Sequence, residues 1–201
     1  VATPTLGASM TVPVTPAVSG QNTLYVKSVD RAGNTSPRAA YTFLAGDASA
    51  PVGRWQFADG GPTADTGQPG GRPLAVAGGA ATGQGIATFN GTTGYAATTT
   101  SPLSTARSFS VGAWVRLAQT PTGSVTAASA SGTHTSAFQL GYSATSNRWA
   151  FTTRSTDVTA PQESVVTSTT APTIGAWTHL LGVYDASAGQ VRMFVNGVMQ
   201  G

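Results

Sequence analysis

Cysteine is absent from this sequence and charged residues are scarce, and both shortages narrow the classes of protein that it can encode. Of the 201 residues none is Cys and only 8% are charged. No disulfide framework can form, and the cysteine content does not distinguish an oxidising from a reducing cellular compartment. A coiled coil, whose heptads need charged residues, is excluded, and 25 Gly with 12 Pro argue against a helical bundle. No apolar run approaches the ~20 residues of a transmembrane helix, so no membrane span is predicted.

Basic residues are too few and too dispersed for a nucleic-acid partner. Lys27 is the only lysine, and the arginines occur singly along the chain, for a formal net charge of +3. Binding to phosphate groups needs several cations on one surface, so we predict no nucleic-acid partner. Thr, Ser, Gly and Ala fill the polar positions instead, and such an uncharged, hydroxyl-rich surface is common in secreted bacterial proteins.

Helical periodicity is missing from nearly the whole sequence. Short runs of alternating apolar and polar residues lie between clusters of Gly, Pro, Asn and Asp, which is typical of an all-β sandwich. In the first part of the chain, residues 24–30 predict a strand, residues 30–34 a turn in which Gly and Asn tolerate positive φ, and residues 41–44 the returning strand. The small residues at 46–51 predict a linker between two domains.

Beyond the linker, strand signals continue to the last residues. The clearest is 109–117, whose odd positions are all apolar, while Trp114 and Arg116 occupy even positions. The other predicted strands and turns are 54–57, 87–89, the turn Asn90-Gly91, 94–96, a hairpin of 137–142 with 148–153, a second hairpin of 177–184 with 190–195, and the turn Asn196-Gly197. This order predicts antiparallel sheets joined by tight turns.

Two stretches of the sequence resemble known families. Residues 22–44 resemble the last strands of a bacterial Ig-like or fibronectin-type repeat, through a Leu-x-Val strand at 24–26 and an Asp-x-Ala-Gly-Asn-x-Ser pattern at 30–36. Residues 52–201 resemble the laminin-G-like branch of the concanavalin A-like lectin/glucanase jelly rolls. The motifs that carry this second resemblance are Trp55–Phe57, Asp65–Gly67, Ala87–Gly91, Phe109–Leu117, Trp177–Asp185 and Val195–Gly197.

The second resemblance implies an all-β, antiparallel jelly-roll sandwich of two curved sheets, with a concave face that binds glycans in lectins and hosts catalysis in glucanases. Laminin-G members are usually non-catalytic adhesion or recognition modules of secreted multidomain proteins, often with a calcium ion. Family members continue past the Asn-Gly hairpin into strands that close the sandwich. We therefore expect a fragment of a longer protein, with a partial Ig-like domain at 1–45, a linker at 46–51, and an incomplete jelly roll at 52–201.

Glycoside hydrolysis needs two carboxyl groups that flank the scissile bond, and the sequence offers no such pair. Glu163 is the only glutamate and lies in a loop-like stretch. Asp59, Asp65 and Asp185 lie in turns, where Asp usually bonds its own backbone. The chain is therefore predicted not to be an enzyme.

The two histidines favour neither a zinc site nor a serine triad. They are far apart in a chain without Cys, and no Gly-x-Ser-x-Gly elbow occurs. His134 lies in a polar loop, and His179 lies in an apolar strand, where we expect a hydrogen-bonded place inside the sandwich. Calcium takes oxygen ligands from irregular loops, which makes Asp65 and Asp59 its candidate ligands. A structural Asx turn explains Asp65 equally well.

Sugar recognition relies on aromatic rings that stack on apolar pyranose faces and on a few polar groups that orient the sugar. Because the odd positions of 109–117 must face the core, Trp114 and Arg116 face outward together. Trp149 shares one face of its strand with Phe151 and Thr153. We predict ligand contacts at Trp114, Arg116 and Trp149, and the alternative is that the tryptophans pack the sandwich.

Together these features predict a non-catalytic recognition or adhesion module of a secreted or cell-surface bacterial protein, with a glycan or extracellular polysaccharide as its ligand. The first alternative is a structural spacer or assembly domain of a larger extracellular protein or toxin, whose open strand edges pair with other domains. The second alternative is a glycoside hydrolase, which would need an acid pair on the concave face.

Overall fold

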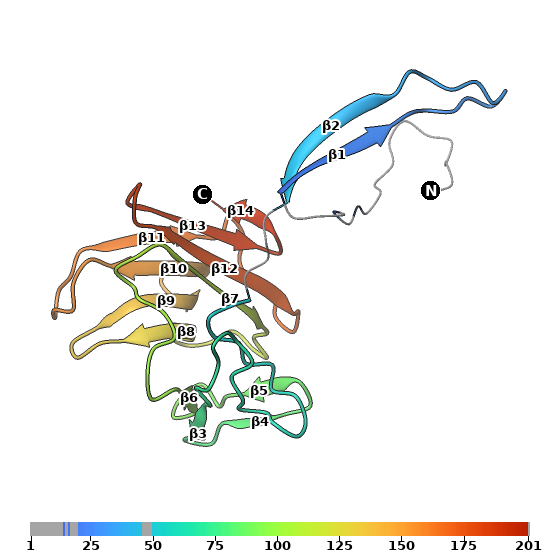
Figure 1. Cartoon of the computed structure of the whole chain (residues 1–201). Helices are drawn as coiled ribbons and strands as arrows, with labels where there is room; N and C mark the ends of the chain where they lie inside the picture. The colour runs from blue at the N-terminus through green and yellow to red at the C-terminus, as the bar shows by residue number, and fades with distance from the viewer. Residues whose placement is uncertain (1–13, 15, 17–19, 46–49, 201) are drawn as a thin grey trace. The chain divides into compact units, whose positions relative to one another are not determined.

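The chain divides into two compact units, Val1–Ala50 and Pro51–Gly201. The computed structural model describes residues 14, 16, 20–45 and 50–200, so most of the predicted linker lies outside the described residues. The described part of the first unit is a two-stranded ribbon, and the second unit holds the layered sheets (Figure 1). Among the residues described, no helix has the length and apolar character to cross a membrane.

One antiparallel hairpin forms the described part of the first unit. Strand β1 (Gly20–Val26) pairs with β2 (Ala39–Ala45) along its whole length. β2 contains the predicted strand at 41–44. β1 begins earlier than predicted and ends earlier too, so the strand predicted at 24–30 was wrong in its last residues. The Ig-like repeat around this hairpin stays a prediction.

Beyond β1 the two arms are joined by a backbone bridge between Val29 and Thr35 and by the hydrogen bonds of the Asp30 side chain. The Asp30 carboxylate accepts hydrogen bonds from the backbone N–H groups of Ala32 and Asn34, at 2.9 and 2.8 Å, and one from the Asn34 amide at 2.8 Å. Gly33 has a φ of 90°, which a side chain would disfavour. The Asp30 side chain thus closes the turn beyond the Val29–Thr35 bridge.

Two four-stranded antiparallel sheets dominate the second unit, and this confirms the prediction of an all-β sandwich. The first sheet has the strand order β14-β13-β12-β7 and the second sheet has the order β11-β10-β9-β8. Their strands are β7 (Phe109–Val115), β8 (Val125–Ser131), β9 (Ser136–Ser143), β10 (Arg148–Arg154), β11 (Glu163–Thr167), β12 (Thr178–Asp185), β13 (Gln190–Val195) and β14 (Val198–Gln200). Figure 1 shows the sheets as two layers, and β13 contacts both β10 and β11 across them.

The core lies between these two layers. On β7 the exposure alternates residue by residue from Phe109 to Val115, as predicted. The buried hydrophobic side chains of the described residues are Phe138, Leu140, Tyr142, Trp149, Phe151, Leu180 and Met193. Burying one side chain of this size contributes about 1.5–3 kcal/mol, so this cluster is the main source of stability for the sandwich.

Gly182 on β12 makes room for the fully buried ring of Phe151 in the core. A Cβ atom at this position would lie 2.5–2.7 Å from ring carbons of Phe151. The Phe151 ring is itself confined by Phe109 and Phe138, whose ring centroids each lie 6.3 Å from its own. A glycine is therefore needed here for close packing between the layers.

Residues 51–97 form two small sheets beside the sandwich. The predicted strand at 54–57 is absent, because Trp55 makes only an isolated bridge to Asp65 and Phe57 has a φ of 55°, outside the extended region. The strands are β3 (Ala75–Ala77) paired with β6 (Tyr95–Ala97), and β4 (Ala81–Gly83) paired with β5 (Ile86–Thr88). β5 and β6 lie within a residue of the strands predicted at 87–89 and 94–96.

Asn90 organises the turn between β5 and β6. Its Oδ1 accepts backbone hydrogen bonds from Thr92, Thr93 and Gly94, at 3.0, 3.0 and 2.8 Å. Its Nδ2 donates to the carbonyl oxygen of Gly78 at 3.0 Å and to the Thr93 hydroxyl at 2.9 Å. The side chain thus ties the turn to the distant loop after β3.

The two predicted hairpins of the sandwich are confirmed. β9 pairs with β10, and β12 pairs with β13, each in antiparallel register. The predicted turn Asn196-Gly197 joins β13 to β14, and its two residues have φ values of 50° and 81°. Positive φ at both positions is what a tight two-residue hairpin turn requires.

Candidate functional site

The outer face of β7 carries an exposed aromatic ring beside a cation. Trp114 is 66% exposed although it lies within a strand. Arg116, two positions further on, is also exposed. Because neighbours on a strand face opposite sides, both side chains point away from the core, as predicted. Large aromatic side chains are mostly covered in folded proteins, so this one marks a candidate contact surface.

The adjacent strand adds two more rings to this surface. His179 on β12 is the cross-strand partner of Trp114, and the two ring centroids are 5.2 Å apart. The Arg116 guanidinium lies 5.1 Å from the centroid of the Trp177 ring, which is 44% exposed. Such a cation–π contact contributes about 0.5–1 kcal/mol at an exposed site. Trp114, Arg116, Trp177 and His179 are called the Trp114 cluster below.

Sequence reasoning missed two members of the Trp114 cluster. It expected His179 to lie inside the sandwich, whereas its half-buried ring contacts Trp114 on the outer face. Thr178 and Leu180 are the buried residues of this stretch, so alternation turns Trp177 and His179 outward. The two-residue alternation of the sequence places Trp177 and His179 on one face. Because β12 is apolar on both faces, its hydrophobicity does not reveal which face is the inner one.

The Asn196 turn fixes the backbone beneath His179. The His179 N–H donates to Asn196 Oδ1 at 2.9 Å, and the Asn196 N–H donates to the His179 carbonyl oxygen at 2.8 Å. The side chain and backbone of one turn residue thus both bond to the same residue of β12. Trp114 and His179 are therefore held on paired strands, and Arg116 and Trp177 lie just beyond the ends of those strands.

Trp149 lies in the core and not on the surface, which corrects its expected role as a ligand contact. It is 4% exposed, and its ring meets that of Tyr142 edge-on at a centroid distance of 6.4 Å. Its backbone N–H donates to the Ser168 hydroxyl at 3.1 Å. Trp149 and Phe151 do lie on the same face of β10, as predicted, but that face is the inner one. The geometry favours the packing role for this tryptophan.

Next to the Trp114 cluster, the outer face of the first sheet lacks a side chain at Gly112 and is partly apolar. Gly112 is aligned with Leu181, Leu181 with Phe194, and Phe194 with Met199. Met199 is 64% exposed. A Cβ atom at Gly112 would lie 3.6 Å from both His179 Nε2 and Leu181 Cδ1. The surface at Gly112 is thus bare backbone bordered by these two side chains.

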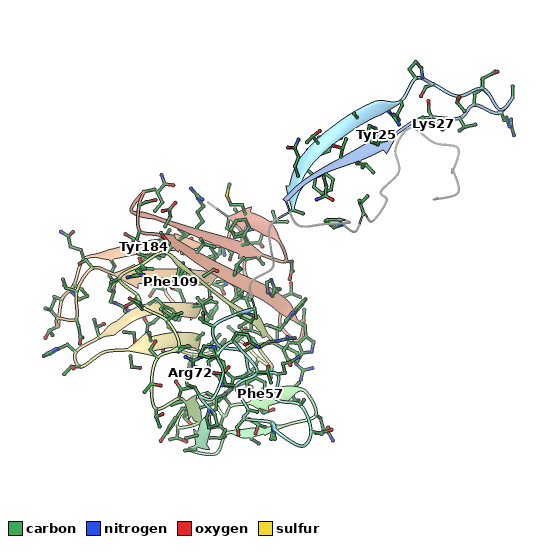
Figure 2. The ribbon with its side chains drawn as sticks, in the orientation of Figure 1. Tyr25, Lys27, Phe57, Arg72, Phe109 and Tyr184 are labelled. Atoms are coloured by element: carbon green, nitrogen blue, oxygen red, sulfur yellow. The ribbon has the colours of Figure 1, made fainter. Side chains whose placement is uncertain are left out.

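A shallow hollow lies at the other end of the same face. Its volume is about 370 Å³, and its lining consists of Ser108, Phe109, Ser110, Val183, Tyr184, Asp185 and Arg192. Ser110, Val183 and Arg192 form one cross-strand row. Phe109 and Tyr184, labelled in Figure 2 at this end of the sandwich, pack their rings 5.7 Å apart. The hollow therefore combines hydroxyl groups, a carboxylate and a guanidinium over a firmly packed base.

Asp65, a predicted calcium ligand, is buried and already paired. Its Oδ1 accepts the backbone N–H groups of Arg54 and Gly67, both at 2.9 Å, and its Oδ2 accepts the Arg72 Nε–H at 3.0 Å. The N–H of Arg54 first, then those of Gly67 and Arg72, lower the pKa of Asp65 to about 2. With its side chain fully covered, the geometry favours the structural role that the sequence left open.

Asp59, the other predicted calcium ligand, is also used in folding. Its Oδ1 accepts the backbone N–H of Gln84 at 2.8 Å and so ties two loops together. Within the described part of the chain, no group of three or more His, Asp and Glu side chains is arranged to hold a metal ion. The side chains thus give no support to a calcium site at Asp59 and Asp65.

The remaining acids that sequence analysis weighed for catalysis have structural partners as well. Asp185 Oδ1 accepts the hydroxyl and the N–H of Ser187, at 2.6 and 3.0 Å. Glu163 Oε1 accepts the Arg154 Nε–H at 2.7 Å. Each carboxylate is bound to a group of the protein, which is the arrangement expected of structural acids in turns and on sheet surfaces.

Asp157 holds the loop that contains His134. It accepts the backbone N–H groups of Thr133, His134 and Thr135, at 2.7, 2.8 and 2.9 Å. These hydrogen bonds, that of Thr133 foremost, lower the pKa of Asp157 to about 2. Gly132 lies against this carboxylate, because a Cβ atom there would come within 2.7 Å of Asp157 Cγ. Sequence reasoning gave no role to Asp157, since its partners are more than twenty residues away.

Comparison with known proteins agrees with this architecture. Residues 90–201, more than half of the chain, match the family model described as the concanavalin A-like lectin/glucanases superfamily. The matched region begins at the Asn90 turn and includes both large sheets. The comparisons with curated proteins and with solved structures gave no match. From its sheets and from this match, the chain belongs to the concanavalin A-like lectin/glucanase superfamily.

Proposed function

We propose that the second unit is a non-catalytic carbohydrate-recognition module of a secreted, multidomain bacterial protein, and that its ligand contacts the outer face of the first sheet. The observation that carries the proposal is Trp114, a tryptophan 66% exposed on a regular strand. Membership of a lectin and glucanase superfamily supports recognition of carbohydrate at the superfamily level.

The Trp114 cluster has the two elements that sugar binding needs. The Trp114 ring offers an apolar face to a pyranose ring, and Arg116 with His179 can hydrogen-bond to hydroxyl groups. The Trp177 ring restrains the Arg116 guanidinium and the Trp114 ring restrains the His179 ring, so little side-chain freedom is lost on binding. A preorganised face of this kind suits binding at the surface of a rigid sheet.

The absence of catalysis is part of the proposal and is supported by the partners of the acids. Glycoside hydrolysis uses one carboxyl group as an acid and a second as a nucleophile or base. Asp59, Asp65, Asp157 and Asp185 each accept hydrogen bonds from backbone N–H groups, and Glu163 pairs with Arg154. None of these groups lies in the Trp114 cluster.

A glycan array followed by titration calorimetry tests the proposal. We expect the wild-type chain to bind a subset of glycans without cleaving them, and Trp114→Ala to weaken that binding at least tenfold, because a central aromatic contact contributes about 2 kcal/mol or more. Tyr95→Ala is the matched control, since Tyr95 is 56% exposed on a strand outside the first sheet. Unchanged binding by Trp114→Ala, with both variants folded, would eliminate this face.

A further inference from the structure

A lane of short side chains runs along the outer face of β7. Along β7 and the residue on either side of it, the outward positions are Ser108, Ser110 and Gly112. The long side chains of Trp114 and Arg116 follow. All five positions are exposed. The sequence thus places its smallest residues in a row, and the Trp114 ring closes one end. The Ser108, Ser110 and Gly112 row is called the Ser110 lane below.

The side of the Ser110 lane is formed by β12. Leu181 is aligned with Gly112, and Val183 with Ser110. Both side chains are only partly exposed, so they form an apolar wall beside the row of small residues. The hollow of about 370 Å³ occupies the end of the lane that includes Ser108 and Ser110. The lane therefore runs from the hollow past Gly112 to Trp114.

The length of the Ser110 lane exceeds that of a single sugar. Trp114 lies six positions after Ser108, and a strand rises about 3.3 Å per residue, so the lane together with Trp114 spans about 20 Å. One pyranose ring fills only a fraction of this distance. A ligand that touches both Trp114 and the hollow must therefore be an oligomer, and it must run straight, because β7 is a regular strand.

The polar groups of the hollow favour an uncharged ligand. Arg192 can donate and Asp185 can accept, and both line the same hollow. Asp185 uses Oδ1 for its bonds to Ser187, and among the described residues Oδ2 has no donor. An acceptor beside a donor matches the hydroxyl groups of a sugar, because each hydroxyl group can both donate and accept a hydrogen bond. Because Asp185 and Arg192 carry opposite charges, the hollow has no net charge that would attract a polymer with a carboxylate or sulfate on each unit.

We propose that the Ser110 lane binds an internal stretch of a straight, uncharged polysaccharide, with one sugar on Trp114 and another between Asp185 and Arg192. This inference rests on the proposed function, and it extends the contact from one aromatic ring to several consecutive subsites. It also identifies Ser110 and Gly112 as specificity-determining positions, since their small size keeps the lane open.

The length dependence of binding tests the inference. The probes are neutral cello-, xylo-, manno- and chito-oligosaccharides, each from the monosaccharide to the hexasaccharide, with oligogalacturonates as the anionic series. For at least one neutral series we expect affinity to rise more than tenfold from monosaccharide to hexasaccharide. Ser110→Leu, which fills the lane, should remove that gain and leave binding of the shortest sugar within twofold. The matched control Ser129→Leu, at an exposed position of β8 in the second sheet, should keep the gain.

The outcomes separate this inference from the proposed function. Binding that depends on Trp114 but is equal for short and long probes, or is unaffected by Ser110→Leu, would overturn the lane and leave the recognition module standing. A preference for oligogalacturonates would overturn the uncharged ligand. Failure of all the neutral series, while the array still reports Trp114-dependent binding of another glycan, would also refute the lane. Loss of Trp114 dependence would refute both.

Discussion

Gly182→Ala should destabilise the sandwich, because the added methyl group has no space. The new Cβ atom would lie 2.5–2.7 Å from the Phe151 ring, about 1 Å closer than the ~3.5–4.0 Å of an ordinary carbon contact. The ring cannot move aside easily, since it is fully buried between Phe109 and Phe138. Overpacking of this kind costs about 1–3 kcal/mol, and replacing a strand glycine returns about 0.5–1 kcal/mol. Taking the middle of each range, we expect a net loss of about 1 kcal/mol.

Urea unfolding followed by tryptophan fluorescence measures this loss in the relevant unit, because all four tryptophans lie in residues 51–201. Gly112→Ala is the matched control: it lies on the neighbouring strand of the same sheet, and its Cβ atom would make only contacts of 3.4–3.6 Å. This control should be neutral or slightly stabilising. Combining Gly182→Ala with Phe151→Leu should show favourable coupling, of about 0.5–3 kcal/mol for residues in contact. Equal stability of the two glycine variants would refute the packing argument.

Three further predictions concern the loops. The pKa of Asp157 is lowered from 3.8 to about 2 in the fold, so its stabilising effect is present above about pH 4 and is lost as the pH falls toward 2. The Asp157→Asn variant should therefore have a lower Tm than wild type at pH 6, and the difference in Tm should close toward pH 2. A difference that stays constant with pH would contradict this. Asn90→Ala removes the acceptor of three backbone N–H groups and should lower the free energy of unfolding by about 1–3 kcal/mol, measured in urea against the exposed control Thr100→Ala. Because Asp65 is filled by N–H donors, EDTA should leave Tm unchanged, and a fall in Tm restored by calcium would contradict that assignment.

Local features of the fold could be predicted from the sequence with good boundaries. The alternation of 109–117 indicated both the strand and the outward direction of Trp114, because the side-chain period of a strand depends only on its own backbone. The Asn196-Gly197 turn was equally local, since its residues tolerate positive φ without help from neighbours. The strand predicted at 54–57 was wrong because a bridge to Asp65 and the backbone of Phe57 replaced ladder pairing.

The sequence by itself therefore determined the all-β architecture, the main hairpins and one exposed tryptophan with its arginine. Only the tertiary structure decided which side of each strand is inside. Trp149 alternates as clearly as Trp114, but the first sheet covers its face, and His179 lies outward on a strand that is apolar on both sides. The row of Ser110, Val183 and Arg192 likewise exists only through strand pairing. Alternation fixes two faces, and the partner layer decides which of them meets the solvent.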